Sequence, residues 1–82
     1  MSDNILEERA KDWGDPLRSH ARIGEMWGAI LRYPVDAYDV ALMMAALKLV
    51  RADLNPDNPD SLIDAKGYLT IAQRIVEEQQ GE

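Results

Sequence analysis

The sequence contains no cysteine, no phenylalanine and one histidine among its 82 residues. The absence of cysteine excludes both a disulfide framework and a thiolate zinc site. A metal site would have to use carboxylate oxygens, which suit Mg²⁺ or Mn²⁺. No apolar run approaches the roughly 20 residues of a membrane span, and no signal-peptide pattern opens the sequence. We therefore expect a soluble cytoplasmic protein with no membrane contact and no required cofactor.

Positive charge is also scarce in this sequence. Nine Lys and Arg residues stand against 15 Asp and Glu residues, which gives a formal net charge of −6. Direct binding to a nucleic-acid backbone needs a basic face, so this balance argues against such a partner. The length predicts one small domain, 1–82, near the lower limit for folding without a disulfide or metal. Residues 1–3 and 79–82 are expected to fray.

The most apolar stretch of the sequence predicts a helix over about 36–53. Asp36 is its expected N-cap, and Asp39 lies in the first turn. Apolar side chains sweep an arc of roughly 200° around this helix. They are Tyr38, Leu42, Met43, Ala45, Ala46, Leu47, Leu49 and Val50. The remaining sector holds Ala41, Met44, Lys48 and Arg51. Because two neighbours in a small monomer rarely cover so wide an arc, we expect a homo-oligomer.

A second amphipathic helix is predicted at about 17–32. Gly24 and Gly28 lie one turn apart beside its apolar face. Glycine within a helix costs about 1 kcal/mol relative to alanine, so this pair predicts the close approach of another backbone. The apolar face consists of Ile23, Met26, Trp27, Ile30 and Leu31.

A third helix is predicted at about 61–78, opening with a sequence that resembles a capping box, Ser61 to Asp64. Its expected buried face, flanked by Ile71 and Ile75, is Leu62, Ala65, Tyr68, Leu69, Ala72 and Val76. A shorter amphipathic helix at 4–13 would pack on these three. The predicted fold class is all-α, a small bundle of three main helices with a short N-terminal helix.

Two polar side chains fall on the apolar sides of their helices. Asp64 shares the angle of the flanking isoleucines, where a carboxylate needs a cation, and Lys48 or Arg51 is the expected supplier. His20 is interpreted as a core-edge histidine with one hydrogen-bond partner, as a ligand contact or, least favoured, as a catalytic base. Asp39 has two interpretations as well, because helix capping and a site carboxylate both explain an acid there.

The order of these signals resembles a family of small uncharacterised phage and prophage proteins, over nearly the whole chain. Its motifs are a Tyr-Gly-Asp-Pro turn, a Trp-containing helix, Asp-Val-x-x-Met-Met leading to Lys-x-x-Arg, and Asp-Ser-x-x-Asp-x-x-Gly-Tyr. Here they correspond to residues 13–16, Trp27, 39–51 and 60–68. Trp13 replaces the Tyr, and His20 stands where Asn is commoner. The resemblance implies a phage or prophage origin and an all-helical fold, and it brings no demonstrated activity.

Weaker similarities point to nucleotide chemistry. Nucleotide-modification-associated phage domains share the Lys-x-x-Arg and Asp-x-x-Gly-Tyr motifs. Helical MazG-like pyrophosphohydrolases clamp Mg²⁺ with a Glu-Glu-x-x-Glu helix and a Glu-x-x-Asp helix. Here Glu7 and Glu8 are followed by Lys11, and Asp36, Asp39 and Asp64 are too few for a metal-catalysis assignment.

Three functions remain open from the sequence. The first is binding of a nucleotide or related phosphorylated small molecule, in nucleotide metabolism or in sequestering a host defence signal. Lys48 and Arg51 would meet the phosphate, and the ring of His20, Trp13 or Tyr68 would stack on the base. Asp39 and Asp64 would orient the two cations or a sugar hydroxyl. The second is an interaction module for a host or phage protein, and the third is a Mg²⁺-dependent nucleotide pyrophosphohydrolase. No catalytic or metal ligand is assigned, and a non-enzymatic role is favoured. The candidate ligand-binding residues are Trp13, His20, Asp39, Lys48, Arg51, Asp64 and Tyr68.

Overall fold

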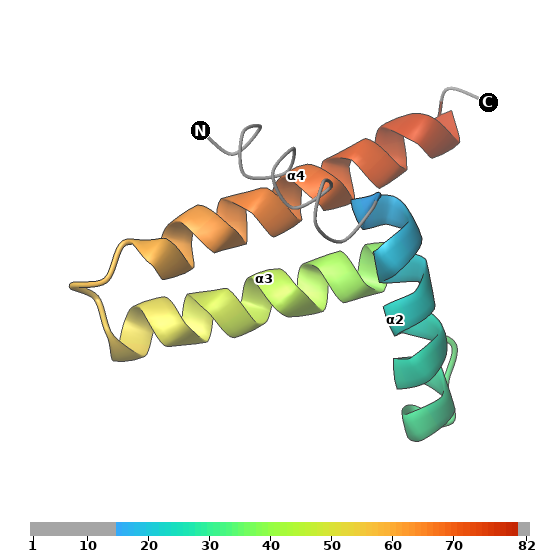
Figure 1. The fold of residues 1–82 in the computed structure, drawn as a ribbon, viewed down its shortest axis with the longest axis horizontal. Helices are drawn as coiled ribbons and strands as arrows, with labels where there is room; N and C mark the ends of the chain where they lie inside the picture. The colour runs from blue at the N-terminus through green and yellow to red at the C-terminus, as the bar shows by residue number, and fades with distance from the viewer. Residues whose placement is uncertain (1–14, 81–82) are drawn as a thin grey trace.

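The computed structural model describes residues 15–80, which form three helices and their connections (Figure 1). α2 spans Pro16–Leu31, α3 spans Ala37–Leu54 and α4 spans Asp60–Gln80. No strand occurs within this range, and the predicted all-α class is confirmed. The three predicted helices are also confirmed, although α4 continues two residues beyond its expected end. The helix predicted at 4–13 lies outside the described residues.

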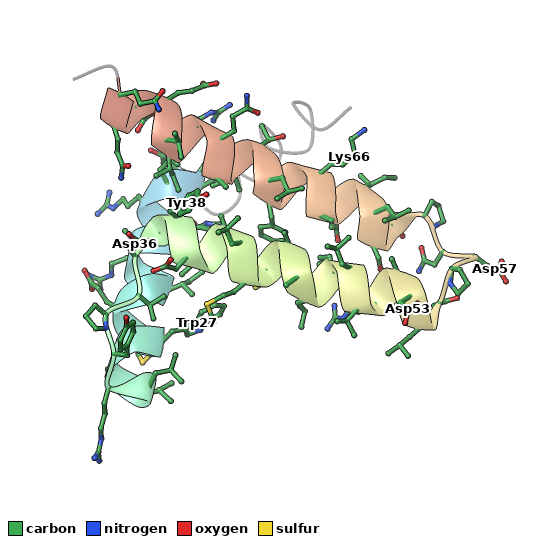
Figure 2. All side chains as sticks on the ribbon, turned by 180° about the vertical axis from the view of Figure 1, so that it is seen from behind. Trp27, Asp36, Tyr38, Asp53, Asp57 and Lys66 are labelled. Atoms are coloured by element: carbon green, nitrogen blue, oxygen red, sulfur yellow. The ribbon has the colours of Figure 1, made fainter. Side chains whose placement is uncertain are left out.

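The helices are arranged as a hairpin with a crossing helix. α3 and α4 run side by side and antiparallel, joined by the loop 55–59 (Figure 1). α2 crosses the end of this hairpin where α3 begins, and it projects beyond α3 on the side away from α4 (Figure 1). α2 and α3 therefore enclose a corner, and Trp27 of α2 lies in it (Figure 2).

Each helix begins at a polar cap that the sequence supplies. The Asp15 carboxylate accepts a hydrogen bond of 3.0 Å from the backbone N–H of Leu17, and proline occupies the first position of α2. At α3, the Asp36 carboxylate accepts from the Asp39 N–H at 2.9 Å, and the Asp39 carboxylate accepts from the Asp36 N–H at 3.2 Å. This reciprocal pair is a capping box, and it confirms Asp36 as the N-cap. α4 begins one residue before its predicted start, and the Asn58 side chain accepts from the Asp60 N–H at 2.9 Å.

The two glycines of α2 meet the backbone that leads into α3. A Cβ atom added to Gly24 would lie 2.6 Å from the carbonyl oxygen of Val35, and one added to Gly28 would lie 3.0 Å from that of Tyr33. The predicted close approach of another backbone is therefore confirmed. The chain reverses sharply enough to reach this position because Arg32, just after α2, adopts the left-handed conformation with φ 58°.

The core between α3 and α4 is built largely from small side chains. Ala41 is fully buried and clusters with Ile71, Ala72 and Ile75 of α4. Val40 and Ala45 of α3 and Ala65 of α4 are buried as well. Short side chains allow two helix axes to approach closely, and the contact then excludes water over the paired faces.

This packing corrects the predicted orientation of α3. Ala41 and the half-buried Met44 and Lys48, which were assigned to the sector outside the apolar arc, lie on the buried side. Most of the predicted arc is instead exposed, namely Leu42, Met43, Ala46, Leu47, Leu49 and Val50. Apolar area alone predicted that the wide arc would be buried. The short alanine side chains instead allow close approach, so the alanine side of α3 contacts α4.

The other two helices also depart from their predicted buried faces. In α2, His20 and Gly24 are the buried residues, whereas Met26, Ile30 and Leu31 are exposed. In α4, Ala65 and Ala72 are buried as predicted, and Ile71, Ile75 and Gly67 join them. Leu62 and Leu69 of the predicted buried face are exposed. In α4 the core thus includes the two isoleucines that were predicted to flank the buried face.

A matched pair of glycine substitutions tests the role of the close approach. Gly24→Ala would force a Cβ against the Val35 carbonyl, so we expect the free energy of unfolding to fall by about 1–3 kcal/mol. Gly67→Ala in α4 meets no atom within 4 Å and should raise that free energy by about 0.5–1 kcal/mol through helix propensity. Urea unfolding measures both changes, and equal effects at the two positions would contradict this interpretation.

Candidate functional site

The predicted pairing of Asp64 with a cation of α3 is confirmed. The Lys48 Nζ and the Asp64 Oδ2 atoms are 2.9 Å apart, with side chains 16 % and 20 % exposed. The pair joins the later part of α3 to the first turns of α4. At this degree of burial the attraction is screened less than between fully exposed charges, and each ion neutralises the other. The pair therefore ties the two arms of the hairpin together.

Arg51, the other predicted cation, lies about one turn further along α3 and is exposed. It occupies the last turn of the helix, where a positive charge interacts favourably with the helix dipole. Lys48 and Arg51 thus have different surroundings, one engaged by a carboxylate between two helices and the other at the surface. Their joint use as a phosphate clamp stays a prediction.

The Asp39 carboxylate serves the N-terminus of α3 through the capping box. It also borders an open hollow of about 450 Å³ where α2, the connection and α3 meet. The lining contains one cation and three carboxylates, together with backbone and apolar groups. Of the predicted site residues that the structure describes, Asp39 alone belongs to it. The lining residues are Gly24, Glu25, Gly28, Arg32, Tyr33, Pro34, Val35, Asp36 and Asp39.

His20 lies at the edge of the core, with 6 % of its surface exposed. Its Nδ1 atom is 2.8 Å from the carbonyl oxygen of Pro16 and donates to it. The Nε2 atom is buried and meets no hydrogen-bonding group within residues 15–80. Burial lowers the pKa of His20 below its ordinary value of 6.5, partly opposed by the hydrogen bond to Pro16. His20 is therefore neutral near pH 7, and within residues 15–80 it has the one hydrogen-bond partner that the core-edge interpretation expects. Its use as a ligand contact stays a prediction.

Tyr68 of α4 is the aromatic neighbour of His20. The two ring centroids lie 5.9 Å apart with the planes tilted by 48°. This distance and tilt fall within the range of attractive aromatic pairs, so the contact helps to join α2 to α4. Both rings are thereby used within the fold, and stacking on a bound base would require this contact to open. The other predicted stacking residue, Trp13, lies outside the described residues.

The predicted site residues are thus distributed over several contacts. Asp39 caps α3, Lys48 pairs with Asp64, and His20 contacts Tyr68. Within residues 15–80, no three His, Asp or Glu side chains are placed to hold a metal ion together. None of the three helices in that range has the length and apolar character needed to cross a membrane. The sequence did not indicate the hollow beside Glu25 and Arg32, because it depends on the reversal of the chain at Arg32.

The hairpin with its crossing helix defines a small all-helical domain. The chain belongs to the family described as "Domain of unknown function (DUF6378)", whose model matches residues 1–76. The "Gene 55 protein" of Mycobacterium phage L5 is 36 % identical over 72 residues, covering 87 % of this chain and 46 % of that protein. The chain therefore spans about half the length of this curated relative. No solved structure matches it. The predicted membership in a family of small phage proteins is confirmed.

The lowered pKa of His20 predicts a dependence of stability on pH. Just below pH 6.5 the unfolded chain binds more protons than the folded one, so folded stability falls as pH drops from 6.5 toward the folded-state pKa. His20→Asn removes this contribution. The difference in free energy of unfolding between the wild type and this variant should shrink between about pH 8 and about pH 5. A difference that stays constant over this range would contradict the assignment.

The ion pair makes a separate prediction about stability. Asp64→Asn should lower the free energy of unfolding by about 1–3 kcal/mol, because the half-buried Lys48 ammonium loses its counter-charge. Adding Lys48→Met should recover much of this loss. Glu77→Gln, an exposed change on the same helix, should alter stability by less than about 0.5 kcal/mol. Thermal or urea unfolding of these four proteins and of the single Lys48→Met variant provides the measurement, and additive effects of the two pair substitutions would exclude the coupling.

Proposed function

We propose that the chain is a protein-interaction module that binds its partner through the outer face of α3. We define this face as Leu42, Met43, Ala46, Leu47, Leu49, Val50 and Leu54, on the side of α3 opposite its contact with α4. The observation that carries the proposal is the exposure of its six large side chains, which ranges from 39 % to 78 %. Monomeric proteins seldom leave so many neighbouring large apolar side chains in water without a binding role.

The spacing of the outer face suits contact with another helix. Met43, Leu47, Val50 and Leu54 follow each other at intervals of four, three and four residues. Leu42, Ala46 and Leu49 form a parallel row at intervals of four and three. These intervals repeat the apolar pattern of helix-on-helix seams, and neither row contains a charged residue. The chemistry that fits is a partner helix with its own apolar stripe.

The gain from covering this face is considerable. Full burial of an aliphatic side chain contributes about 1.5–3 kcal/mol, so six that are about half exposed offer roughly 5–9 kcal/mol. Loss of translational and rotational freedom on association costs roughly 4–15 kcal/mol. The outer face alone therefore supports only weak binding, and a stable complex needs neighbouring surface as well.

The corner between α2 and α3 supplies this additional surface. Trp27 lies in the corner and is half-buried (Figure 2). Met26 and Ile30, on the same side of α2 as Trp27 by helical spacing, are 64 % and 71 % exposed. A partner seated in the corner would touch both helices and cover these apolar side chains. Tryptophan is among the residue types that contribute most binding energy in protein interfaces.

Binding of a nucleotide-like molecule remains a second hypothesis from the sequence, and it has less support in the geometry. Lys48 and Asp64 engage each other, and the hollow beside Asp39 includes neither Lys48 nor Arg51. A thermal-shift screen with nucleotides would decide it. A ligand at 100 times its dissociation constant adds about 2.7 kcal/mol, and Lys48→Ala or Arg51→Ala should abolish that shift. Hydrolysis of a nucleotide with Mg²⁺ gains no observation in its favour.

The relationship to a phage protein gives the proposed module a setting. A module of this family would act in the cytoplasm of an infected or lysogenic bacterium, on a phage protein, a host protein or another copy of itself. Its acidic surface would discourage adsorption to nucleic acid, while the uncharged outer face would select apolar partners.

Site-specific photo-crosslinking tests the proposal in bacterial cells. A photoreactive amino acid at Leu47 or Val50 should give a discrete adduct under ultraviolet light, because the outer face is covered in the complex. The same amino acid at Lys66, on the exposed side of α4 (Figure 2), should give none. A Leu42→Asp substitution in the same chain should abolish the Leu47 adduct by introducing a charge into the contact. Equal adducts at Leu47 and Lys66, or adducts insensitive to Leu42→Asp, would refute the proposal.

A further inference from the structure

We infer that the partner of the outer face is a second copy of this chain, arranged antiparallel about a two-fold axis near Ala46 and Leu47. This inference rests on the proposed interaction function and names its partner. A two-fold contact places the same surface on both sides of the interface, so the surface must complement itself. An uncharged face with two regular apolar rows meets this condition, because no like charges are brought together at its centre.

The exposed apolar area is sufficient for such a dimer. A buried methylene corresponds to roughly 30 Å² of accessible surface, so a four-carbon side chain presents about 130 Å² when fully exposed. At their observed exposures, the six large side chains of the outer face together with Met26 and Ile30 present roughly 600 Å². A standard interface buries about 800 Å² per partner, of which about 60 % is apolar, or about 480 Å². The available area exceeds this requirement.

The charges of the chain favour the antiparallel arrangement. Residues 53–60, at the closed end of the hairpin, carry three Asp and no Lys or Arg. Residues 16–39, at the opposite end, carry three Arg against one Glu and two Asp, which balance in charge. Antiparallel packing brings the acidic end of one copy to this balanced end of the other, which contains three cations. Parallel packing would instead place the two acidic ends together, and like charges at close range oppose association.

The shape of the molecule leads to the same arrangement. α2 projects beyond α3 on the side of the outer face, so each copy has an L-shaped outline (Figure 1). In the antiparallel dimer, α2 of one copy lies beyond the end of α3 of the other. Leu54, 78 % exposed near the end of α3, then packs against Met26 and Ile30 of the second copy. Parallel packing would bring the two projecting helices against each other and hold the outer faces apart.

The absence of cysteine allows a clean test of this geometry. An axis near residues 46 and 47 places Met43 of one copy opposite Val50 of the other. Oxidation of a mixture of Met43→Cys and Val50→Cys chains should therefore give mainly the mixed disulfide. Each variant alone should crosslink more slowly, and Lys66→Cys should give no more dimer than random collision. Dominant 43–43 and 50–50 disulfides would overturn the antiparallel arrangement.

Sedimentation of the full chain tests whether two copies associate. The wild type should pass from monomer to dimer as concentration rises through the micromolar range, and Leu47→Asp should weaken dimerisation at least ~100-fold. Circular dichroism should show unchanged helix content in the Leu47→Asp monomer, because that side chain is outside the core. A second variant, Val50→Lys, repeats the test should Leu47→Asp fail to fold.

A wild-type monomer at about 200 µM, well above the expected micromolar Kd, would overturn the inference. The photo-crosslinking result then distinguishes failure of the dimer from failure of the proposed interaction function. A Leu47 adduct whose mass differs from twice that of the chain would leave the interaction function standing with another partner. If the wild type is monomeric and no discrete adduct forms, both the dimer and the proposed interaction function are refuted.

Discussion

The close contact between the alanine-rich faces of α3 and α4 is the constraint on which the rest of the structure depends. Ala41 packs against Ala72 and the two buried isoleucines of α4, with Ala45 and Ala65 buried further along the hairpin. Helices paired through short side chains approach closely and gain contact along their length. The larger side chains of α3 are then excluded from that contact, and they occupy the opposite side of the helix.

The sequence contained most of what determines the ends and contacts of the elements. Asp36 and Asp39 indicated the start of α3, and the two glycines of α2 indicated a close backbone. The angle of Asp64 indicated a partly buried ion pair with a cation of α3. Each of these inferences rests on a local rule, in which one residue type satisfies one requirement of hydrogen bonding, sterics or charge. Such rules act over a few residues and depend little on the rest of the fold.

The orientation of the helices could not be obtained in the same way. An apolar arc of roughly 200° has two possible contact sides, and hydrophobicity does not distinguish them. The distinguishing signal was the spacing of Ala37, Ala41 and Ala45 at intervals of four residues, which marks a narrow groove for a neighbouring helix. Hydrophobicity ranks Leu47 above Ala41, whereas close packing reverses the order. The candidate ligand set failed to converge for a related reason, because Asp39, Asp64 and His20 each satisfy a structural requirement within the described residues.

The same constraint connects the fold to the proposed function. A core in which Val40 is the one large side chain less than 2 % exposed, among residues 15–80, gains limited free energy from burial. The outer face of α3 and the exposed side chains Met26 and Ile30 of α2 hold further apolar surface that is still in contact with water. Association that covers this surface would therefore stabilise each subunit, because a partner that binds only the folded chain raises its free energy of unfolding. In this protein the use of alanine for the internal contact leaves leucine and methionine on the outer face, and the proposed assembly would follow from how the core is packed.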